Sequence, residues 1–357
     1  MPTLSYLSML RSFLPSRTPT YLVFAVTSRC NADCRICFYW ERLNRPSNEL
    51  SLSEIKKISE SFGYVSNLVI SGGEPFLRDD LDKICLLFYK NNGTRFFNIP
   101  TNGILSEKIE LITKNILRLC KKATISLELS LDGIGKTHDQ IRGASGLFDH
   151  VMETYRRLKQ AKQSYNNLWL KVNTTFCYHN QDEMNEIYNY VSNVMDVDDH
   201  SISLIWGMPK DPQAKKIDLD RYINFIAMFE KNKRLKRKSI LDRIIFIVRQ
   251  LVNREVIKVA QERRLSSPCT AIRKIVFINE EGKVYPCGLI TEEIGDLREQ
   301  ELDINKVLCS LKRYEIQKKY GILSTCACNW DCALFNNVIY NWRNYPRIVR
   351  NLLEGSK

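Results

Sequence analysis

The sequence predicts an α/β fold: a partial (βα)6 barrel followed by a small Cys-rich domain made of a β-hairpin and helices. Three observations predict it. Strand-like and helix-like segments alternate over roughly the first two hundred residues, which favours a parallel sheet curled into a barrel. Polar or glycine-rich motifs follow these strands, where the active site of a parallel barrel forms. Cysteines then gather near the C-terminus, from Cys269 to Cys332.

Apolar runs rich in β-branched residues predict the six strands. They are expected at residues 21–27, 67–71, 95–99, 124–131, 168–176 and 201–206. Amphipathic stretches between the strands predict helices at residues 79–91, 106–120, 148–163 and 181–194. A further helix is expected to begin at Ser51-Leu52-Ser53-Glu54, because a Ser three residues before a Glu forms a capping box.

The chain divides into four predicted parts. They are an N-terminal segment at 1–17, the barrel at 18–215, a helical connector at 216–266 and the C-terminal domain at 267–357. The connector is strongly charged and free of Pro and Gly, which indicates long helices. The C-terminal part is predicted to be built around metal, because its cysteines are so closely spaced.

Composition limits the functional classes. The chain has 357 residues, 44% of them hydrophobic, and no apolar stretch approaches the ~18 residues of a membrane span. Twelve cysteines without an export signal indicate metal ligands in a reducing cytoplasm. The net charge is +13, and six of the eight residues in Lys231–Lys238 are basic. This run is interpreted as a solvated helix face or as a site for an anionic partner, but no motif favours nucleic acid.

The most informative motif is C-x3-C-x2-C, formed by Cys30, Cys34 and Cys37 directly after the first strand. Three thiolates on one loop can hold three irons of a [4Fe–4S] cluster and leave the fourth iron open. An open metal position is where chemistry takes place. The alternative is a zinc knuckle, which needs a fourth Cys or His close by. The four histidines all lie at least a hundred residues from Cys37.

The second strand is followed by Ser71-Gly72-Gly73-Glu74-Pro75. Gly72 and Gly73 let the backbone approach a bound group closely. The carboxylate of Glu74 can accept a charge-assisted hydrogen bond from an ammonium group. The alternative is ordinary turn chemistry, since turns after strands need glycine.

Polar residues also follow the fourth and fifth strands. Ser130 and Asp132 are two residues apart, so on a strand they point to the same side and could hold the hydroxyl groups of a ribose. The guanidinium of Arg142 suits a carboxylate. Asn173 lies on the fifth strand. The sequence does not identify a catalytic acid or base.

Taken together, these motifs resemble the radical S-adenosylmethionine (SAM) superfamily, over residues of about 20–210. The resemblance implies that Cys30, Cys34 and Cys37 hold a [4Fe–4S] cluster and that SAM chelates its open iron. It implies that an external donor of the flavodoxin or ferredoxin type supplies an electron. Cleavage of SAM then gives a 5′-deoxyadenosyl radical that removes hydrogen from the substrate. The residues that the resemblance places near SAM are Gly72, Gly73 and Glu74 at its amino group, Arg142 at its carboxylate, Ser130 and Asn173 near the ribose and carboxylate, and Tyr39 near the adenine.

The C-terminal part resembles the SPASM/twitch extensions of the same superfamily. Cys269 is followed by a strand-like run, Ile275–Ile278, and by a Gly-x4-Cys motif that ends at Cys287. Because no cysteine follows Cys332, the resemblance implies one auxiliary [4Fe–4S] cluster rather than two. Its expected ligands are Cys269 and Cys287, then Cys328 and Cys332, with Cys326 as a further candidate. A zinc ribbon is the alternative. The remaining cysteines, Cys85, Cys120, Cys177 and Cys309, are expected to be buried hydrophobic residues.

The expected substrate is a small or lipid-linked metabolite, either sugar-like or a lipid. A membrane contact by Leu4–Leu14 and the basic connector would suit such a substrate. One alternative is an enzyme that modifies ribosomally made peptides, although only about twenty residues precede the barrel. A hypothesis of another class is a zinc-stabilised, non-catalytic binding protein. The sequence does not specify the net reaction or the oligomeric state.

Overall fold

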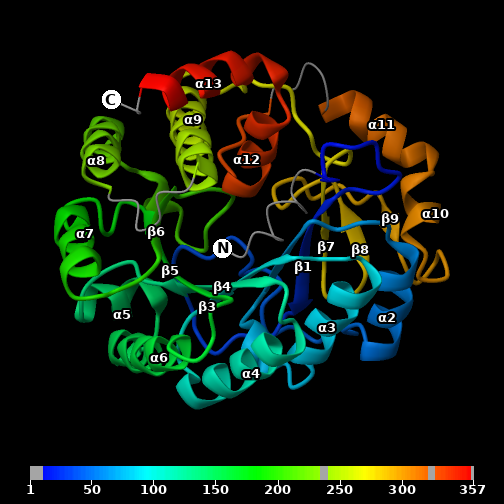
Figure 1. The fold of residues 1–357 in the computed structure, drawn as a ribbon, viewed down its shortest axis with the longest axis horizontal. Coiled ribbons are helices and arrows are strands. Elements are labelled where there is room, and N and C mark those ends of the chain that lie inside the picture. The colour runs from blue at the N-terminus through cyan, green and yellow to red at the C-terminus, as the bar shows by residue number, and fades with distance from the viewer. Residues whose placement is uncertain (1–10, 234–239, 321–325, 355–357) are drawn as a thin grey trace.

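The computed structural model describes residues 11–233, 240–320 and 326–354. Six parallel strands lie side by side in their sequence order and form a curved sheet (Figure 1). They are β1 (Tyr21–Thr27), β2 (Asn67–Gly72), β3 (Phe96–Thr101), β4 (Thr124–Ser130), β5 (Leu168–Phe176) and β6 (Asp199–Leu204). All six predicted strands are present, with ends that differ by no more than two residues. The predicted α/β class and partial barrel are confirmed.

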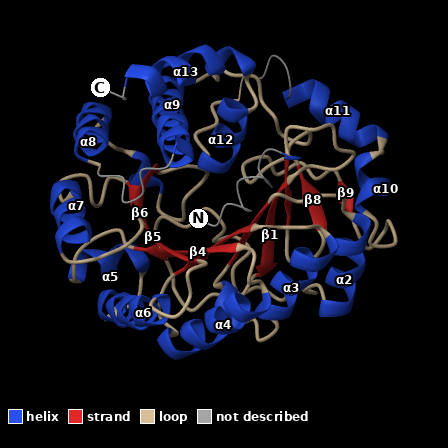
Figure 2. Cartoon of the chain, in the orientation of Figure 1, coloured by secondary structure: helices blue, strands red, loops and turns tan. Residues whose placement is uncertain are grey.

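Helices connect the strands and cover the outside of the sheet (Figure 2). They are α2 (Leu52–Ser61), α3 (Leu81–Asn91), α4 (Ser106–Leu119), α5 (Lys136–Arg142), α6 (Leu147–Lys162) and α7 (Met184–Asn193), with 3-10 turns η1 (Pro75–Leu77) and η2 (Pro212–Lys215). The short helix α5 is not predicted by the sequence pattern. The capping box is confirmed, since Ser51 Oγ accepts from the amide of Glu54 and Glu54 Oε2 accepts from the amide of Ser51 (2.8 Å).

The connector is helical, as predicted. It contains α8 (Leu219–Asn232) and the longer α9 (Ile240–Glu262), and α9 packs against the C-terminal helices (Figure 1). Most of the basic run Lys231–Lys238 falls at 234–239, outside the described residues, as do the first residues of Leu4–Leu14. No helix within the described ranges has the length and apolar character that a bilayer crossing requires.

The C-terminal part adds strands to the barrel sheet. The strand β7 (Ile275–Ile278) pairs in parallel with β1, and antiparallel β8 (Lys283–Tyr285) and β9 (Gly295–Asp296) extend the sheet beyond it. The strand β7 coincides with the strand-like run Ile275–Ile278 of the sequence. The helices that follow are α10 (Ile304–Leu308), α11 (Leu311–Tyr320), α12 (Asp331–Ile339) and α13 (Tyr345–Glu354), with the turn η3 (Trp342–Asn344).

The start of α12 lies between the two ends of the parallel sheet. Asp331 Oδ2 accepts a hydrogen bond from Ser203 Oγ on β6 (2.7 Å). Just before the helix, Asn329 Nδ2 donates to the carbonyl oxygen of Ile205 (2.9 Å). On the other side, the hydroxyl of Tyr21 on β1 is hydrogen bonded to the thiol of Cys332. The start of α12 therefore bridges the opening of the partial barrel.

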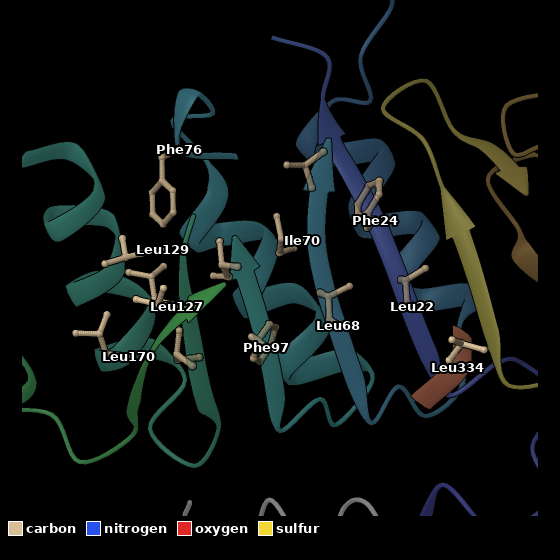
Figure 3. Packing of buried hydrophobic residues seen from close by; sticks show 14 of the residues in the cluster. Leu22, Phe24, Leu68, Ile70, Phe76, Phe97, Leu127, Leu129, Leu170 and Leu334 are labelled. Atoms are coloured by element: carbon tan, nitrogen blue, oxygen red, sulfur yellow. The ribbon is translucent and has the colours of Figure 1, made fainter. Parts of the chain in front are cut away.

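Each parallel strand turns one face to the helices and the other to the interior of the barrel. On β5, Leu170 and Val172 are fully buried under the helices, whereas Lys171, Asn173 and Thr175 line an interior cavity. This alternation is the period-two geometry of a strand. Figure 3 shows the helix-facing core, in which leucine and phenylalanine side chains of neighbouring strands pack in rows. The interior face is therefore free to carry polar groups.

A buried arginine holds the end of β1. Arg78 is 7% exposed, and its Nη1 donates to the carbonyl oxygens of Val26 (2.9 Å) and Leu50 (3.0 Å). Its Nε and Nη2 pair with the carboxylate of Asp80 at 2.8 Å each. Since Val26 is next to the last residue of β1, this arginine fixes the point from which the motif-bearing loop departs.

We expect Arg78→Met to lower the free energy of unfolding by about 3 kcal/mol, because Asp80 and two carbonyl oxygens lose their buried partner. The control is Arg156→Met, which breaks an exposed ion pair with Glu153 and should cost about 1 kcal/mol or less. Anaerobic urea unfolding followed by circular dichroism measures both. Equal losses in the two variants would contradict the structural role of Arg78.

Candidate active site

The three cysteines of the C-x3-C-x2-C motif lie on the loop after β1. Cys30, Cys34 and Cys37 all line one cavity of about 300 Å³ at the C-terminal ends of the barrel strands. Burial raises the pKa of the Cys30 thiol to about 11 and that of Cys37 to about 12. Among the described residues, no three His, Cys, Asp or Glu side chains converge closely enough for a single metal ion. The donor set fits a [4Fe–4S] cluster, whose irons supply the positive charge that buried thiolates need.

Two glycines bring the end of β2 against the backbone that carries the first cysteine. The amide of Gly73 donates to Thr27 O and the amide of Glu74 donates to Arg29 O, both at 2.8 Å. A Cβ at Gly73 would lie 2.1 Å from Arg29 O. A Cβ at Gly72, where φ is +112°, would lie 2.3 Å from Thr27 O. Packing of the cysteine loop therefore requires both glycines, whatever ligand they also contact.

The C-terminus of α5 holds the other side of the cysteine loop. The amide of Arg35 donates to the carbonyl oxygen of Ile141 (2.9 Å). Gly143 ends the helix in the left-handed conformation, with φ +66°, and a Cβ there would lie 2.2 Å from Asp33 O. The helix α5, which the sequence does not predict, thus supports the cysteine loop at Asp33, the residue before Cys34.

Arg142 connects α5 to the cysteine motif. Its guanidinium forms a salt bridge with Asp132, and its Nη1 lies 3.8 Å from the Sγ of Cys34. Asp132 is fully buried and also accepts from the amide of Thr175 (2.6 Å). The suggestion that Asp132 joins Ser130 in holding a ribose is therefore not supported, because its oxygens are already engaged below the cavity wall. Arg142 itself lines the cavity.

Glu74 also lines the cavity, although its side chain is only 1% exposed. One carboxylate oxygen accepts from Thr101 Oγ1 (2.9 Å) and the other accepts from the amide of Asn102 (2.8 Å). Burial raises the pKa of Glu74 to about 7. The carboxylate therefore joins the loop after β2 to the loop after β3.

The two remaining polar candidates lie on neighbouring strands. Ser130 at the end of β4 is paired in register with Asn173 on β5, and both line the cavity. Asn173 Oδ1 accepts from Ser201 Oγ (2.8 Å) and Ser203 Oγ (3.1 Å) on β6. The structure thus brings Ser130 and Asn173 together, on the side of the cavity opposite β1.

The expected contact of Tyr39 with adenine does not fit the structure. Tyr39 is buried, its hydroxyl is hydrogen bonded to Glu280, and it is not among the residues that line the cavity. Several other aromatic residues do line it, among them Phe38 and Trp206, whose ring centroids lie 3.9 Å apart. The position of Phe38 directly after the third cysteine is the signal in the sequence that points to it.

Comparison with known protein families identifies the fold and its chemistry. Residues 24–191 match the model of the Radical SAM superfamily. This part of the chain is a radical SAM domain. The match begins within β1 and ends within α7, so it leaves out β6, but it contains the cysteine motif, the Gly-Gly-Glu turn and Arg142. The protein is therefore an enzyme, and the zinc-stabilised binding protein is set aside.

Relatives extend the similarity over most of the chain. The chain is 25% identical to an AdoMet-dependent heme synthase of Methanosarcina barkeri, over 80% of this chain and 81% of that protein. It is 27% identical to a probable GTP 3′,8-cyclase of Methanococcus aeolicus, over 86% and 98%. Among solved structures, anSMEcpe with bound AdoMet matches with a TM-score of 0.60 at 16% identity, over 94% and 100%. Streptococcus suis SuiB bound to S-adenosylmethionine matches at 0.56 and 17%, over 83% of this chain and 66% of that one.

The interior of this radical SAM enzyme carries charged side chains that the sequence analysis missed. Lys171 and Glu128, on adjacent strands, form a salt bridge of 2.6 Å. Asp331 lies at the start of α12, and burial raises its pKa. The guanidinium of Arg249 on α9 lies 5.0 Å from the ring centroid of Phe335. All five side chains line the cavity. The sequence does contain a signal for this charged interior, because single charged residues such as Glu128 interrupt otherwise apolar strands.

The C-terminal cysteines of the radical SAM enzyme separate into two groups. The thiols of Cys269, Cys287, Cys326 and Cys328 lie close enough to affect one another's pKa, and Cys326 is hydrogen bonded to Cys328. Cys332 is hydrogen bonded to Tyr21 and lines the barrel cavity. Because Cys332 lies in the first turn of α12, its direction is set by that helix. Of the candidate ligands, Cys326 thus lies with Cys269, Cys287 and Cys328, whereas Cys332 faces the barrel cavity.

The cysteines outside both groups differ from one another. Cys85, Cys120 and Cys177 are fully buried, which confirms the prediction of hydrophobic core positions. Cys309 ends α10 and is exposed, so the same prediction for Cys309 is wrong. Its apolar sequence neighbours Val307 and Leu308 are buried, which explains the error.

Gly143→Ala tests the support that α5 gives to the cysteine loop, with Gly146→Ala as a matched control. Both positions have a positive φ, 66° and 72°, so both variants should lose about 1–2 kcal/mol of stability through backbone strain. Only Gly143→Ala also forces Asp33 and the loop to move. We expect it alone to lower the iron content and visible absorbance of the anaerobically reconstituted enzyme. Equal iron in both variants would contradict this role.

Proposed function

We propose that this radical SAM enzyme reductively cleaves SAM at a [4Fe–4S] cluster and removes hydrogen from a small or lipid-linked metabolite. Cys30, Cys34 and Cys37 would hold the cluster. The observation that carries the proposal is the shared cavity, which the three thiols, the Gly-Gly-Glu turn and the charged interior all line. When bound, the cluster supplies the electron that converts SAM to methionine and the 5′-deoxyadenosyl radical.

The proposed role of the surrounding residues is to orient SAM. Glu74 would receive its ammonium group, because a buried carboxylate that lines the cavity can accept a charge-assisted hydrogen bond. The backbone at Gly72 and Gly73 would form the adjacent wall. Arg142 would face the carboxylate, and its salt bridge with Asp132 would keep the guanidinium in position.

The opposite wall would contact the nucleoside. Ser130 and Asn173 are adjacent across β4 and β5, and their polar groups are suited to hydroxyl groups of the ribose. Phe38 and Trp206 offer flat apolar surfaces nearby, which suit an adenine ring. In this proposal Phe38 and Trp206, rather than Tyr39, contact the adenine.

The charged interior supports a polar substrate. Lys171 is matched by Glu128, whereas Arg249 has a ring contact with Phe335 and no acidic partner within hydrogen-bond distance among the described contacts. A substrate with a carboxylate or phosphate group would complement Arg249. The relatives named as heme synthase and GTP 3′,8-cyclase carry the names of small-molecule enzymes, which favours a metabolite over the rival peptide substrate.

An auxiliary [4Fe–4S] cluster is proposed for Cys269, Cys287, Cys326 and Cys328, whose thiols lie together. The electron for SAM cleavage would come from a flavodoxin or ferredoxin. A reducing cytoplasm would keep all twelve cysteines available as thiols, and each of them is free in the structure.

The first test is product formation by the reconstituted enzyme. With SAM and dithionite under anaerobic conditions, we expect 5′-deoxyadenosine by mass spectrometry and loss of this product in Cys34→Ala. Cys85→Ala is the matched control, since Cys85 is buried in α3 outside the cavity. The proposal fails if the wild-type enzyme makes no 5′-deoxyadenosine, or if Cys34→Ala makes as much as the control.

The second test concerns the C-terminal cysteines. We expect about eight irons per chain in the wild-type enzyme and about four in Cys328→Ser, as two [4Fe–4S] clusters require. Cys332→Ser should keep about eight, because Cys332 lies beside Tyr21 rather than in the group of four thiols. An iron loss in Cys332→Ser equal to that in Cys328→Ser would show that the ligand set is wrong.

A further inference from the structure

The C-terminal helix α13 exposes a row of apolar side chains. Tyr345, Val349 and Leu353 are spaced by four residues, so they lie in one row along the helix. They are 39%, 54% and 69% exposed, and Trp342 in the preceding turn η3 is 70% exposed. Together with Pro346 these side chains line a shallow, almost entirely apolar depression. A contiguous apolar surface of this kind marks an interaction site more often than scattered residues do.

The exposed row is not the face by which α13 is attached. Ile348 is buried and Leu352 packs against the core, so the helix is held by a second apolar face. The carbonyl oxygen of Leu352 accepts from Arg243 of α9 (2.9 Å), and the hydroxyl of Tyr345 donates to the carbonyl oxygen of Ile339 (3.1 Å). Figure 1 shows α13 beside α9 at the rim of the molecule. The helix is therefore docked by its other face, and along the exposed row only the hydroxyl of Tyr345 has a hydrogen-bond partner among the described residues.

Positive charge surrounds the row. Arg343, Arg347 and Arg350 are all exposed. Arg343 lies over the Trp342 ring at 5.9 Å, and Arg350 pairs with Glu354, the single acidic residue of α13. Trp and Tyr together with basic residues are typical of side chains at a membrane–water interface. The surrounding charge matches the anionic headgroups of a bilayer.

A second exposed apolar pair lies next to this helix in the fold. Phe13 and Leu14 are 40% and 60% exposed. The ring of Phe13 lies 5.0 Å from that of Tyr340, which directly follows α12, and Ser12 Oγ is hydrogen bonded to the hydroxyl of Tyr340 (2.7 Å). The N-terminal segment is thus held against the turn that leads into α13.

We propose that the surface formed by Trp342, Tyr345, Val349 and Leu353, with its flanking arginines, binds an anionic lipid bilayer peripherally. The helix would lie in the interface with its exposed row among the lipid chains. A second copy of the chain fits this surface poorly, because the same three arginines of both copies would face each other. This inference does not depend on the proposed reaction.

Vesicle flotation of the reconstituted holoenzyme tests it. The probes are vesicles of phosphatidylcholine alone and of phosphatidylcholine mixed with phosphatidylglycerol. We expect binding to the mixed vesicles, weakened by salt, and at least tenfold weaker binding by the variant Trp342→Ser/Val349→Ser/Leu353→Ser. The control Leu111→Ser/Leu119→Ser removes two exposed leucines from α4 and should bind as the wild type does.

The charge contribution is tested by Arg343→Gln/Arg347→Gln, which should weaken binding to the mixed vesicles several-fold and leave binding to the neutral ones unchanged. All variants should keep their iron content and their formation of 5′-deoxyadenosine, since none of these residues lines the barrel cavity. No flotation of the holoenzyme would overturn the proposal. So would flotation that the triple variant leaves unchanged, or a dimer in sedimentation that only the triple variant abolishes. Loss of binding only on deletion of residues 1–10 would also overturn it.

Discussion

The cysteine loop contains no helix or strand of its own, so its shape depends on its neighbours. Two of the contacts are backbone approaches that exclude a Cβ: Gly73 against the carbonyl of Arg29, and Gly143 against the carbonyl of Asp33. A side chain can adopt another rotamer, but these carbonyl groups cannot move without moving the end of β2 or of α5. Because Cys30 and Cys34 each follow one of the two carbonyl groups, the positions of the thiols depend directly on these approaches.

The barrel interior follows from the same strands. One face of each strand stabilises the fold by burying apolar side chains under the helices, and the other face can then carry polar groups. Charges in such a place are costly unless they are paired, because the desolvation of each ion must be compensated. Lys171 and Glu128 meet this condition with each other, and Asp331 accepts from Ser203. Arg249 is only half-buried, and although burial raises the pKa of the neighbouring Asp331, the charge of Arg249 lowers it.

The sequence predicts the elements better than the directions of individual side chains. Strand periodicity, the capping box and the glycine pair depend on local chemistry, and all are found in the structure. The errors concern contacts made by distant parts of the chain. Tyr39 is hydrogen bonded to Glu280, more than two hundred residues away, and Asp132 accepts from the amide of Thr175 on the next strand. The short helix α5 was missed because its seven residues are too few to show a periodic pattern.

The position of Cys332 shows that the predicted domain boundary at residue 267 does not separate the residues of the barrel cavity from the C-terminal part. Cys326 and Cys328 lie with Cys269 and Cys287, yet Asp331 and Cys332 line the barrel cavity only a few residues later. Trp330 between them packs against Gly288 on one side and lies 5.9 Å from the ring of Trp206 on the other. One short segment thus forms part of both sites. The wall of the cavity and the C-terminal thiols are therefore close along the chain, because only Asn329 and Trp330 separate Cys328 from the start of α12.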